Sequence, residues 1–538
     1  MLRKIGIALA FSALMLPASA FARDGDHKRV DIEPYIEADQ VLEADLSPDN
    51  DVVTYTRLAV GVDSSFQGRN SAGALSLRYE RRIGEGDGSP DGDLFSGIAR
   101  VSASIVPHTL TVEAGGLAAR TNVQGDGAAL ISPLADEVGK SNVYAVYAGP
   151  SLNAHTGDLD IDGHYFIGYT RLDQSDATVT TPSAGQVDVF DDSLTQSAEL
   201  RVGSRPHELL PVGVGVGGGY YQEDVSNLDQ RVRDLHARGD VTVPVSPNLA
   251  FAGGIGYENV QVSSRDAVRD SSGAPLIGSD GRYVTDKNSP RVLAYDVEGL
   301  IWDVGVLWRP SSRTSFEAHV GRRYGSTSYY GTLSYEPNKR TSVNVAVYDS
   351  VSGFGGQVNR MIQNLPTDFT ANRNPLSGDI SGCVVSLAAG SCFGGNLGDV
   401  RSSTFRARGV VATLGYDFGR MQAGIGGGYD RRTFIAAPGT VLASANGAVD
   451  ESYWVAAYLN AKLDERSSIS TDAYATWFQS GFDLAGASAS YGASAAYYRS
   501  LLPHLEARAA VSIDGLTGKT LPDDYWSAAA LLGLRYSF

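Results

Sequence analysis

The chain has 538 residues, among them 62 glycines, 27 tyrosines and only two cysteines, and its formal net charge at pH 7 is −17. So few cysteines exclude a disulfide-rich secreted scaffold. The acidity argues against nucleic acid as a partner, because phosphate backbones are bound through lysine and arginine. Many soluble secreted proteins are equally acidic, so charge alone does not identify a membrane protein.

The first 22 residues have the pattern of a secretory signal peptide. Two cations precede an apolar run from Ile5 to Leu16, and small residues follow it up to Ala22. The run is shorter than a membrane-spanning helix, and no later stretch of the sequence approaches that length. We therefore predict that residues 1–22 are removed. The mature chain then begins near Arg23, and its net charge changes from −17 to −19 because two cations are lost.

Segments in which apolar and polar residues alternate recur from residue 31 to the end of the chain. Alternation with period two is the pattern of β-strands. The predicted strands are 31–46, 52–66, 72–83, 93–106, 109–123, 142–154, 158–172, 193–203, 212–222, 231–245, 248–262, 299–309, 313–323, 327–336, 341–351, 403–418, 421–434, 452–463, 467–478, 485–499, 504–514 and 525–538. They number about 22, within a range of about 16 to 22, and the number is even, as bacterial single-chain outer-membrane barrels require.

The connections alternate between short and long when they are followed back from Phe538. Short ones such as 309–313, 418–421 and 463–467 are rich in the residues that form tight turns. The long polar ones are 82–92, 124–141, 173–192, 263–298, 352–402 and 436–451. A soluble sandwich or propeller has no reason to sort its loops in this way, whereas outer-membrane barrels have short periplasmic turns and long extracellular loops. We therefore predict an all-β fold: a single antiparallel transmembrane β-barrel over residues 23–538, with the amino terminus in the periplasm.

A glycine-rich run from Gly213 to Gly219 matches a dinucleotide-binding fingerprint as text. That fingerprint requires a helix directly after the glycines, whereas Tyr220 and Tyr221 continue a strand. Similar runs at 253–256 and 426–428 lie on other predicted strands. We interpret these glycines as thinning the barrel wall where it bends or where an inward loop packs.

Charges of both signs lie on the faces that we predict to line the lumen. They are Glu199, Arg201, Asp234, His236, Arg238, Glu317, His319, Arg323, Asp472, Glu506, Arg508 and Arg535. One reading is a hydrated wall whose charges pair across neighbouring strands. The other is a surface that selects a polar or charged solute. A polar, water-filled lumen is expected in either case.

Cys383 and Cys392 lie in the longest connection, 352–402. Metal binding would need further ligands at short spacing, and the sequence places none nearby. A disulfide formed in an oxidising compartment is therefore predicted. The stapled loop would either cap the mouth or fold into the lumen as a constriction, with a short helix near 357–365.

Catalysis has no support in the sequence. None of the eight histidines lies in a motif with a nucleophile or forms a metal-binding pair at helical spacing. The prediction is no enzyme, no catalytic or metal site and no cofactor.

The last strand alternates strictly and ends on an aromatic residue at the carboxyl terminus. Its apolar face includes Leu534, Tyr536 and Phe538, whereas Arg535 and Ser537 lie on the other face. This ending resembles the signature that the barrel-assembly machinery reads in Gram-negative outer-membrane proteins. The resemblance implies an outer-membrane location and an assembly signal at these three residues.

Three further segments resemble hairpins of uncharacterised proteobacterial barrels. They are Ile32-Glu-Pro-Tyr-Ile-Glu37, Tyr79-Glu-Arg-Arg82 and Gly321-Arg-Arg-Tyr-Gly-Ser-Thr-Ser-Tyr-Tyr-Gly-Thr-Leu-Ser-Tyr335. Those barrels resemble components encoded with exopolysaccharide and protein-sorting (PEP-CTERM/exosortase) systems. The resemblance implies a place in the cell envelope and a link to polysaccharide export, and it supplies no functional residues.

The leading functional prediction is an outer-membrane channel or export pore for a polar solute, linked to exopolysaccharide. Only 23–30 separates the predicted signal peptide from the first strand, so we expect no plug domain and a hollow barrel. The alternative is a structural or adhesive barrel that acts through its external loops, and a third class is a soluble secreted all-β protein. The expected partners are outer-membrane lipid and lipopolysaccharide, the barrel-assembly machinery, and a polysaccharide or other polar solute.

Overall fold

A computed structural model describes most of the chain. The described residues are 29–48, 50–86, 89–123, 129–130, 140–174, 178–181, 184–187, 192–278, 282–367, 369, 371, 373–378, 380, 383–385, 390–392, 404–481, 486–519 and 523–538. The predicted signal peptide and parts of the predicted loops 124–141, 173–192 and 352–402 lie outside them.

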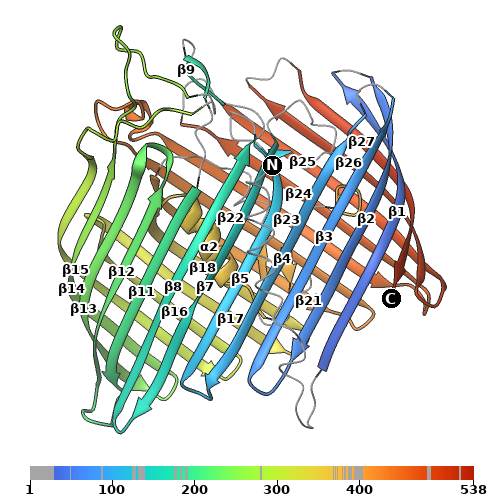
Figure 1. The fold of residues 1–538 in the computed structure, drawn as a ribbon. Coiled ribbons are helices and arrows are strands. Elements are labelled where there is room, and N and C mark those ends of the chain that lie inside the picture. The colour runs from blue at the N-terminus through green and yellow to red at the C-terminus, as the bar shows by residue number, and fades with distance from the viewer. Residues whose placement is uncertain are drawn as a thin grey trace.

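One antiparallel sheet closes on itself to form a barrel (Figure 1). Among the described residues it has 23 strands, and because the two-residue β6 (Ala129–Leu130) pairs with β5 alone, 22 remain in the ring. They are β1 (Arg29–Ser47), β2 (Val52–Gln67), β3 (Ser71–Glu85), β4 (Gly92–Val106), β5 (Leu110–Val123), β7 (Lys140–Thr156), β8 (Leu159–Gln174), β11 (Asp192–Ser204), β12 (Gly213–Val225), β13 (Gln230–Ser246), β14 (Leu249–Ser264), β15 (Val292–Ser311), β16 (Thr314–Arg323), β17 (Ser326–Asn338), β18 (Thr341–Ser352), β21 (Thr404–Asp417), β22 (Met421–Ile435), β23 (Val449–Lys462), β24 (Ser467–Gln479), β25 (Ala487–Leu502), β26 (Leu505–Gly518) and β27 (Tyr525–Ser537).

The first and last strands close the ring. β1 pairs with β27 from Tyr35 opposite Ser537 to Ser47 opposite Trp526. The sheet therefore has no free lateral edge, so backbone polar groups are satisfied between neighbouring strands, as a membrane-spanning sheet requires. The prediction of a large antiparallel barrel with about 22 strands is confirmed.

The two faces of the wall differ as a membrane barrel requires. On β27 the outward residues Leu532 and Leu534 are 69% and 47% exposed, whereas the inward Leu531 is 2% exposed. On β21 the outward Leu414 is exposed and the inward Phe405 is buried. An exposed apolar outer face and a polar inner face suit lipid outside and water inside. The protein is an outer-membrane β-barrel, and the predicted localisation is confirmed.

Short turns and long connections lie at opposite ends of the barrel (Figure 1). The turn end holds the carboxyl terminus, and its turns include those at 418–421 and 463–467. The strand predicted at 299–309 is longer than expected, because β15 begins at Val292 and its first residues pair with β14 alone. Two short hairpins, β9 (Thr178–Thr181) with β10 (Ala184–Val187) and β19 (Cys383–Val385) with β20 (Gly390–Cys392), lie outside the ring sheet. Two short 3-10 helices, η3 (Asn227–Asp229) and η4 (Ala443–Ala445), lie in other connections.

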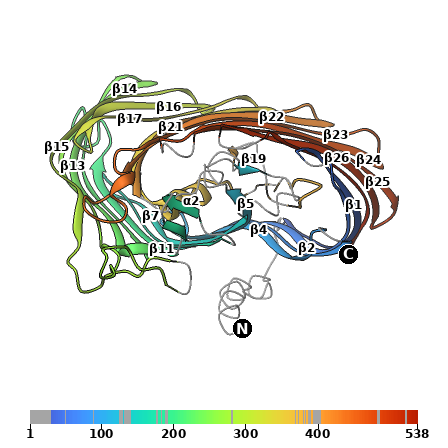
Figure 2. The same cartoon turned by 90° about the horizontal axis from the view of Figure 1, so that it is seen from above.

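No helix among the described residues is long and apolar enough to cross a membrane. The α-helix α2 (Phe354–Gln363) instead lies inside the ring (Figure 2). It overlaps the short helix predicted near 357–365. The chain enters the lumen directly after β18, so for the described residues of this connection up to Gly378 the structure shows the inward one of the two predicted arrangements. We call α2 and the described residues that follow it as far as Gly378 the lumenal segment.

Candidate functional site

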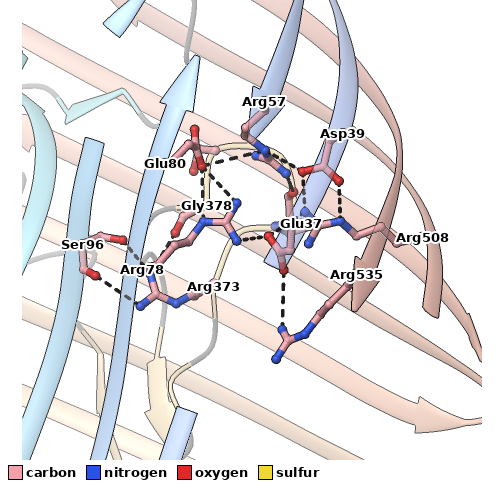
Figure 3. A network of polar contacts seen from close by, with 12 residues as sticks. Glu37, Asp39, Arg57, Arg78, Glu80, Ser96, Arg373, Gly378, Arg508 and Arg535 are labelled. Carbon is pink, nitrogen blue, oxygen red and sulfur yellow. Dashed lines mark hydrogen bonds and ion pairs between the residues drawn. The ribbon is translucent and has the colours of Figure 1, made fainter. Parts of the chain in front are cut away.

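Six charged side chains form a closed ring of alternating sign on the inner wall (Figure 3). Asp39 on β1 pairs with Arg57 on β2 at 2.9 Å, and Arg57 lies 3.8 Å from Glu80 on β3. Glu80 pairs with Arg78, and Arg78 pairs with Glu37 on β1. Arg508 on β26 completes the circuit, because it donates to both Glu37 and Asp39. We call these residues the charge ring, and each is buried.

Three more arginines lie around the charge ring. Arg82 on β3 donates to Glu80 at 2.7 Å, and Arg535 on β27 lies 3.6 Å from Glu37. Arg373, from the lumenal segment, donates to Ser96 on β4 and to Ser76 on β3. Removing one partner of a buried ion pair leaves an uncompensated charge, which costs about 3–5 kcal/mol. The cluster is therefore a rigid part of the wall.

The lumenal segment is fixed to this cluster by its backbone. Arg57 donates to the carbonyls of Pro375 and Leu376, Arg82 to that of Ser377 at 3.1 Å, and Arg373 to that of Gly378 at 3.0 Å. We call residues 374–378 the carbonyl turn, because four consecutive carbonyls point at guanidinium groups.

Asn374 shapes the carbonyl turn from within. Its side-chain oxygen accepts hydrogen bonds from the amides of Leu376 and Ser377 at 2.9 and 3.0 Å, and its carbonyl accepts from the amide of Gly378. An asparagine that bonds amides two and three residues ahead stabilises a turn locally. The amides are therefore bonded inside the turn, and the carbonyls of Pro375, Leu376 and Ser377 face arginines of the wall.

Gly378 is required by both its backbone and its surroundings. Its φ is +72°, and a Cβ at this position would lie 2.7 Å from a carboxylate oxygen of Glu80. A larger residue would be strained and would push the carbonyl turn away from the charge ring.

The other end of the lumenal segment is anchored by a carboxylate. Glu223 on β12 accepts from the amides of Gly353 at 2.7 Å and Gly356 at 3.0 Å, and from the hydroxyls of Ser193 and Tyr221. The first amides of a helix have no partner within the helix, and a negative charge there also favours the helix dipole. Glu223 therefore caps α2 from the barrel wall.

An apolar patch inside the lumen holds the body of α2. Val358, Met361 and Ile362 are buried on α2 and pack with Leu365 and Phe369. The wall contributes Ala74, Ile98, Leu117, Ala119, Val143, Ala145, Tyr147 and Leu172 from β3, β4, β5, β7 and β8. The inner wall is apolar in this sector, and α2 covers it, so these side chains do not face water. The expected polar lumen does not hold for this sector.

Glycines let charged side chains lie flat on the wall between β11 and β16. Arg201 on β11 reaches Asp240 on β13 at 2.6 Å across Gly215 on β12, where a Cβ would lie 2.4 Å from the guanidinium. Arg238 on β13 reaches Asp303 on β15 at 2.8 Å across Gly254 on β14 in the same way. Gly215 and Gly254, one in each of the glycine-rich runs, therefore make room for ion pairs that join every second strand.

The structure places all twelve predicted lumen charges at inward-facing positions of their strands. Arg508 belongs to the charge ring, Arg535 lies beside it, and Glu506 lies on the same inward face of β26. The group on β11, β13 and β16 comprises Glu199, Arg201, Asp234, His236, Arg238, Glu317, His319 and Arg323. Within it Arg323 pairs with Asp234, and His319 lies between Asp303 and Glu317. Asp472 on β24 is apart from both groups and accepts from Ser494. A role for any of them in selecting a solute stays a prediction.

Sequence reasoning missed the residues that hold the lumenal segment. Glu37, Asp39, Arg57, Glu80 and Glu223 were not among the predicted lumen charges, although Arg78, Glu80 and Arg82 recur at the two-residue spacing of one strand face. That spacing was the signal in the sequence that could have identified these residues.

Cys383 and Cys392 lie directly opposite each other in the backbone register of β19 and β20. Their side chains lie outside the described part of the structure, so the disulfide stays a prediction. Leu534, Tyr536 and Phe538 lie on the outer face at the turn end of the barrel.

Comparison with known proteins relates this chain to outer-membrane receptors by fold alone. No family model and no curated protein matches the sequence. The ferric-catecholate import receptor Fiu of E. coli K12, in its closed form, is 10% identical with a TM-score of 0.46, covering 94% of this chain and 81% of that one. The FrpB iron transporter of Neisseria meningitidis is 11% identical with a TM-score of 0.44, covering 94% and 82%. The siderophore receptor PiuA of Acinetobacter baumannii is 10% identical with a TM-score of 0.42, covering 96% and 82%.

The prediction of a channel or export pore linked to exopolysaccharide is wrong. The solved structures that resemble the chain are named as import receptors, siderophore receptors and metal transporters. The lumen is also not hollow, because α2 lies inside the ring and the carbonyl turn is fixed to the wall by buried arginines. A sequence pattern shows which face of a strand is polar, and it does not show what fills the space between the walls.

Proposed function

We propose that this protein is an outer-membrane uptake transporter in which the lumenal segment is the gate. The observation that carries the proposal is the way this segment is held. α2 packs on an apolar patch through several side chains, whereas the carbonyl turn is held mainly by hydrogen bonds to arginines that are already paired within the wall. The turn buries one large apolar side chain, Leu376, among wall residues such as Val41 and Leu531, so its release exposes less apolar surface than release of α2 would. Inward passage is the direction to be measured, as in the import receptors named above.

The two anchors predict a hinged movement. α2 stays on β5, β7 and β8, because exposing its buried apolar side chains would cost about 1.5–3 kcal/mol for each. The carbonyl turn contributes the burial of one large apolar side chain, Leu376, and net hydrogen bonds of about 0.5–1.5 kcal/mol each, or somewhat more for those to charged donors. A ligand that supplies equivalent bonds can offset this part.

The test compares the full-length protein with a variant in which residues 353–378 are replaced by a flexible glycine–serine linker. Both are reconstituted into liposomes, and the uptake of small fluorescent solutes of different charge is followed. We expect the intact barrel to take up little and the linker variant to admit solutes freely. Heat-modifiable migration on an SDS gel confirms that both variants are folded.

Equal rates for the two proteins would show that the lumenal segment is not a gate. No uptake by either protein would overturn the transport proposal as a whole. A third variant with the same linker replacing 267–285 in the connection between β14 and β15 is the control for loop shortening, and it is expected to behave like the intact barrel.

The route to the membrane is proposed on sequence grounds. We infer that residues 1–22 are the signal peptide of a barrel that occupies 23–538. We also infer that Leu534, Tyr536 and Phe538 are read by the barrel-assembly machinery and that the outer face contacts lipopolysaccharide. The exposed position of the three residues at the turn end supports this reading.

A further inference from the structure

The carbonyl turn occupies a site on the wall that has the chemistry of an oxyanion receptor. Arg57 uses Nε for Asp39, and its two remaining nitrogens, Nη1 and Nη2, donate to the carbonyls of Leu376 and Pro375. A guanidinium that presents two parallel donors to two oxygens is the arrangement that binds a carboxylate or a phosphate. Here the two oxygens come from neighbouring peptide groups.

Arg82 extends the same site. The carbonyl of Ser377 accepts from Arg82, so three consecutive carbonyls meet two guanidiniums of the wall, whereas the carbonyl of Gly378 accepts from Arg373 of the lumenal segment itself. Arg57 is fully buried beneath the carbonyl turn. Asp39 and Glu80 hold its guanidinium in place on the wall side, at 2.9 and 3.8 Å. The donors are therefore oriented before any ligand arrives.

A neutral carbonyl is the weaker partner for such a site. The bonds from Arg57 to the peptide oxygens are already charge-assisted on the donor side, but the carbonyl carries no net charge. An oxyanion that reached Arg57 would keep two such bonds and add the attraction between opposite charges, which is strong in a buried site. The carbonyl turn would then leave the wall, and its amides, which are bonded only within the turn through Asn374, would become exposed to water.

We propose that Arg57, with Arg82 beside it, binds a carboxylate or phosphate group of the transported solute, and that the carbonyl turn occupies this site when no solute is bound. The solute opens the lumen by displacing the carbonyl turn from the charge ring. This inference rests on the proposed function and names its substrate class as an oxyanion-bearing solute.

Hydrogen–deuterium exchange on the intact full-length protein in detergent micelles tests the displacement. The amides of Leu376, Ser377 and Gly378 are hydrogen-bonded within the carbonyl turn, and those of α2 serve as an internal reference. Inorganic phosphate and sodium acetate are added in separate arms, with sodium chloride at equal ionic strength as the control. We expect phosphate or acetate to raise exchange in the carbonyl turn at least threefold, while α2 and the chloride control are unchanged.

Arg57→Lys keeps the positive charge and removes the two-pronged donor geometry. We expect it to raise the half-maximal anion concentration about tenfold, as the loss of one such bond implies. Arg100→Lys is the matched control, because Arg100 is a lumenal arginine that pairs with Glu113 at 2.8 Å. It is expected to respond as the unmodified protein does.

Each contrary result has a distinct meaning. If neither anion changes exchange while the linker variant still takes up solutes faster than the intact barrel, the oxyanion site is wrong and the proposed function stands. An equal response in Arg57→Lys, or an equal response to chloride, also overturns the site. If the anions act but no solute ever passes, the proposed function fails and a binding site without transport remains. The arm that acts at lower concentration distinguishes phosphate from carboxylate.

Discussion

At the scale of residues, the site depends on charges placed two positions apart on one face of a strand. Arg78, Glu80 and Arg82 follow one another on β3, and Glu37 and Asp39 do so on β1. Because inward side chains alternate with outward ones, such spacing puts opposite charges side by side on the lumenal wall. Arg57 and Arg82 can then bond to carboxylates of the wall and still donate to the lumenal segment.

Glu80 is the member of the charge ring whose loss should cost most. Its carboxylate lies within ion-pair distance of Arg57 at 3.8 Å, Arg78 at 3.1 Å and Arg82 at 2.7 Å. Glu80→Gln should destabilise the barrel by about 3–5 kcal/mol, because these guanidiniums lose their shared counter-charge. The measurement is the temperature at which the folded band disappears on an SDS gel. Glu113→Gln, which affects the single pair with Arg100, should lower that temperature much less, and an equal fall in both would contradict the shared role of Glu80.

Gly378→Ala should open the gate without a change in charge. The new Cβ would meet Glu80, and the left-handed backbone adds about 1–3 kcal/mol of strain. We expect faster solute uptake into liposomes and faster amide exchange in the carbonyl turn. The matched control is Gly419→Ala in the turn between β21 and β22, where φ is +89° and nothing lies within 4 Å of the added carbon. If uptake rises equally in both variants, the effect comes from backbone strain alone and not from contact between the new Cβ and Glu80.

At the scale of elements, α2 is a short helix that depends on its surroundings. Its ten residues are too few for stability in isolation, since isolated helices shorter than about 12–15 residues are marginal in water. The apolar patch and the carboxylate of Glu223 supply what the helix lacks. Position in the sequence explains the contact, because the chain leaves β18 at Ser352 and the next residue already bonds to β12.

Glu223→Gln should loosen the start of α2 and leave the carbonyl turn in place. The amide side chain loses the charge that two helix amides and two hydroxyls share, at a cost of about 1–2 kcal/mol. We expect faster amide exchange at 353–357 and unchanged exchange at 376–378. Glu199→Gln, on the same wall but 60% exposed, should change neither. Faster exchange at 376–378 would show that the two anchors are coupled and are not the independent ends of a hinge.

The sequence was sufficient to predict the elements because alternation is a local signal. All 22 predicted strands are found, and the inward positions of Arg201, Asp472 and Arg535 follow from the same alternation. The start of β15 was missed because its first residues lack a partner in β16, so they gave no hairpin signal. The contents of the lumen were not predictable, because contacts such as that between Arg57 and Leu376 join residues more than 300 positions apart.

At the scale of the whole molecule, the barrel has an apolar outer surface that must be covered by lipid. Its interior is held by separate contacts, those of the charge ring and the lumenal segment. The outer positions near the turn end, such as Leu502 at 63% and Phe538 at 67%, are among the most exposed apolar side chains. Such residues stabilise the protein only when lipid covers them. Their effects on assembly and on stability can therefore be separated by experiment.

Phe538→Ala should reduce assembly in cells and leave the folded barrel almost as stable as before. The side chain is largely exposed, so its loss creates no cavity in the wall, and the folded band should melt at nearly the same temperature. We expect several-fold less folded protein in isolated outer membranes. Leu502 lies at the end of β25, at the same end of the barrel as Phe538, and its side chain is about as exposed. Leu502→Ala should therefore assemble normally. Equal yields for both variants would contradict an assembly signal at the carboxyl terminus.

The way the charge ring is built also determines when it can form. Arg508 meets Glu37 and Asp39 across β27, although 469 positions separate Arg508 from Asp39 along the chain. These three side chains come together only after the last strand has docked on the first. Until then Glu37 and Asp39 lack the guanidinium of Arg508, and the part of the wall on which Leu376 packs is incomplete. We therefore expect the carbonyl turn to dock only after the ring has closed, so that a barrel whose carbonyl turn is in place has already completed its wall.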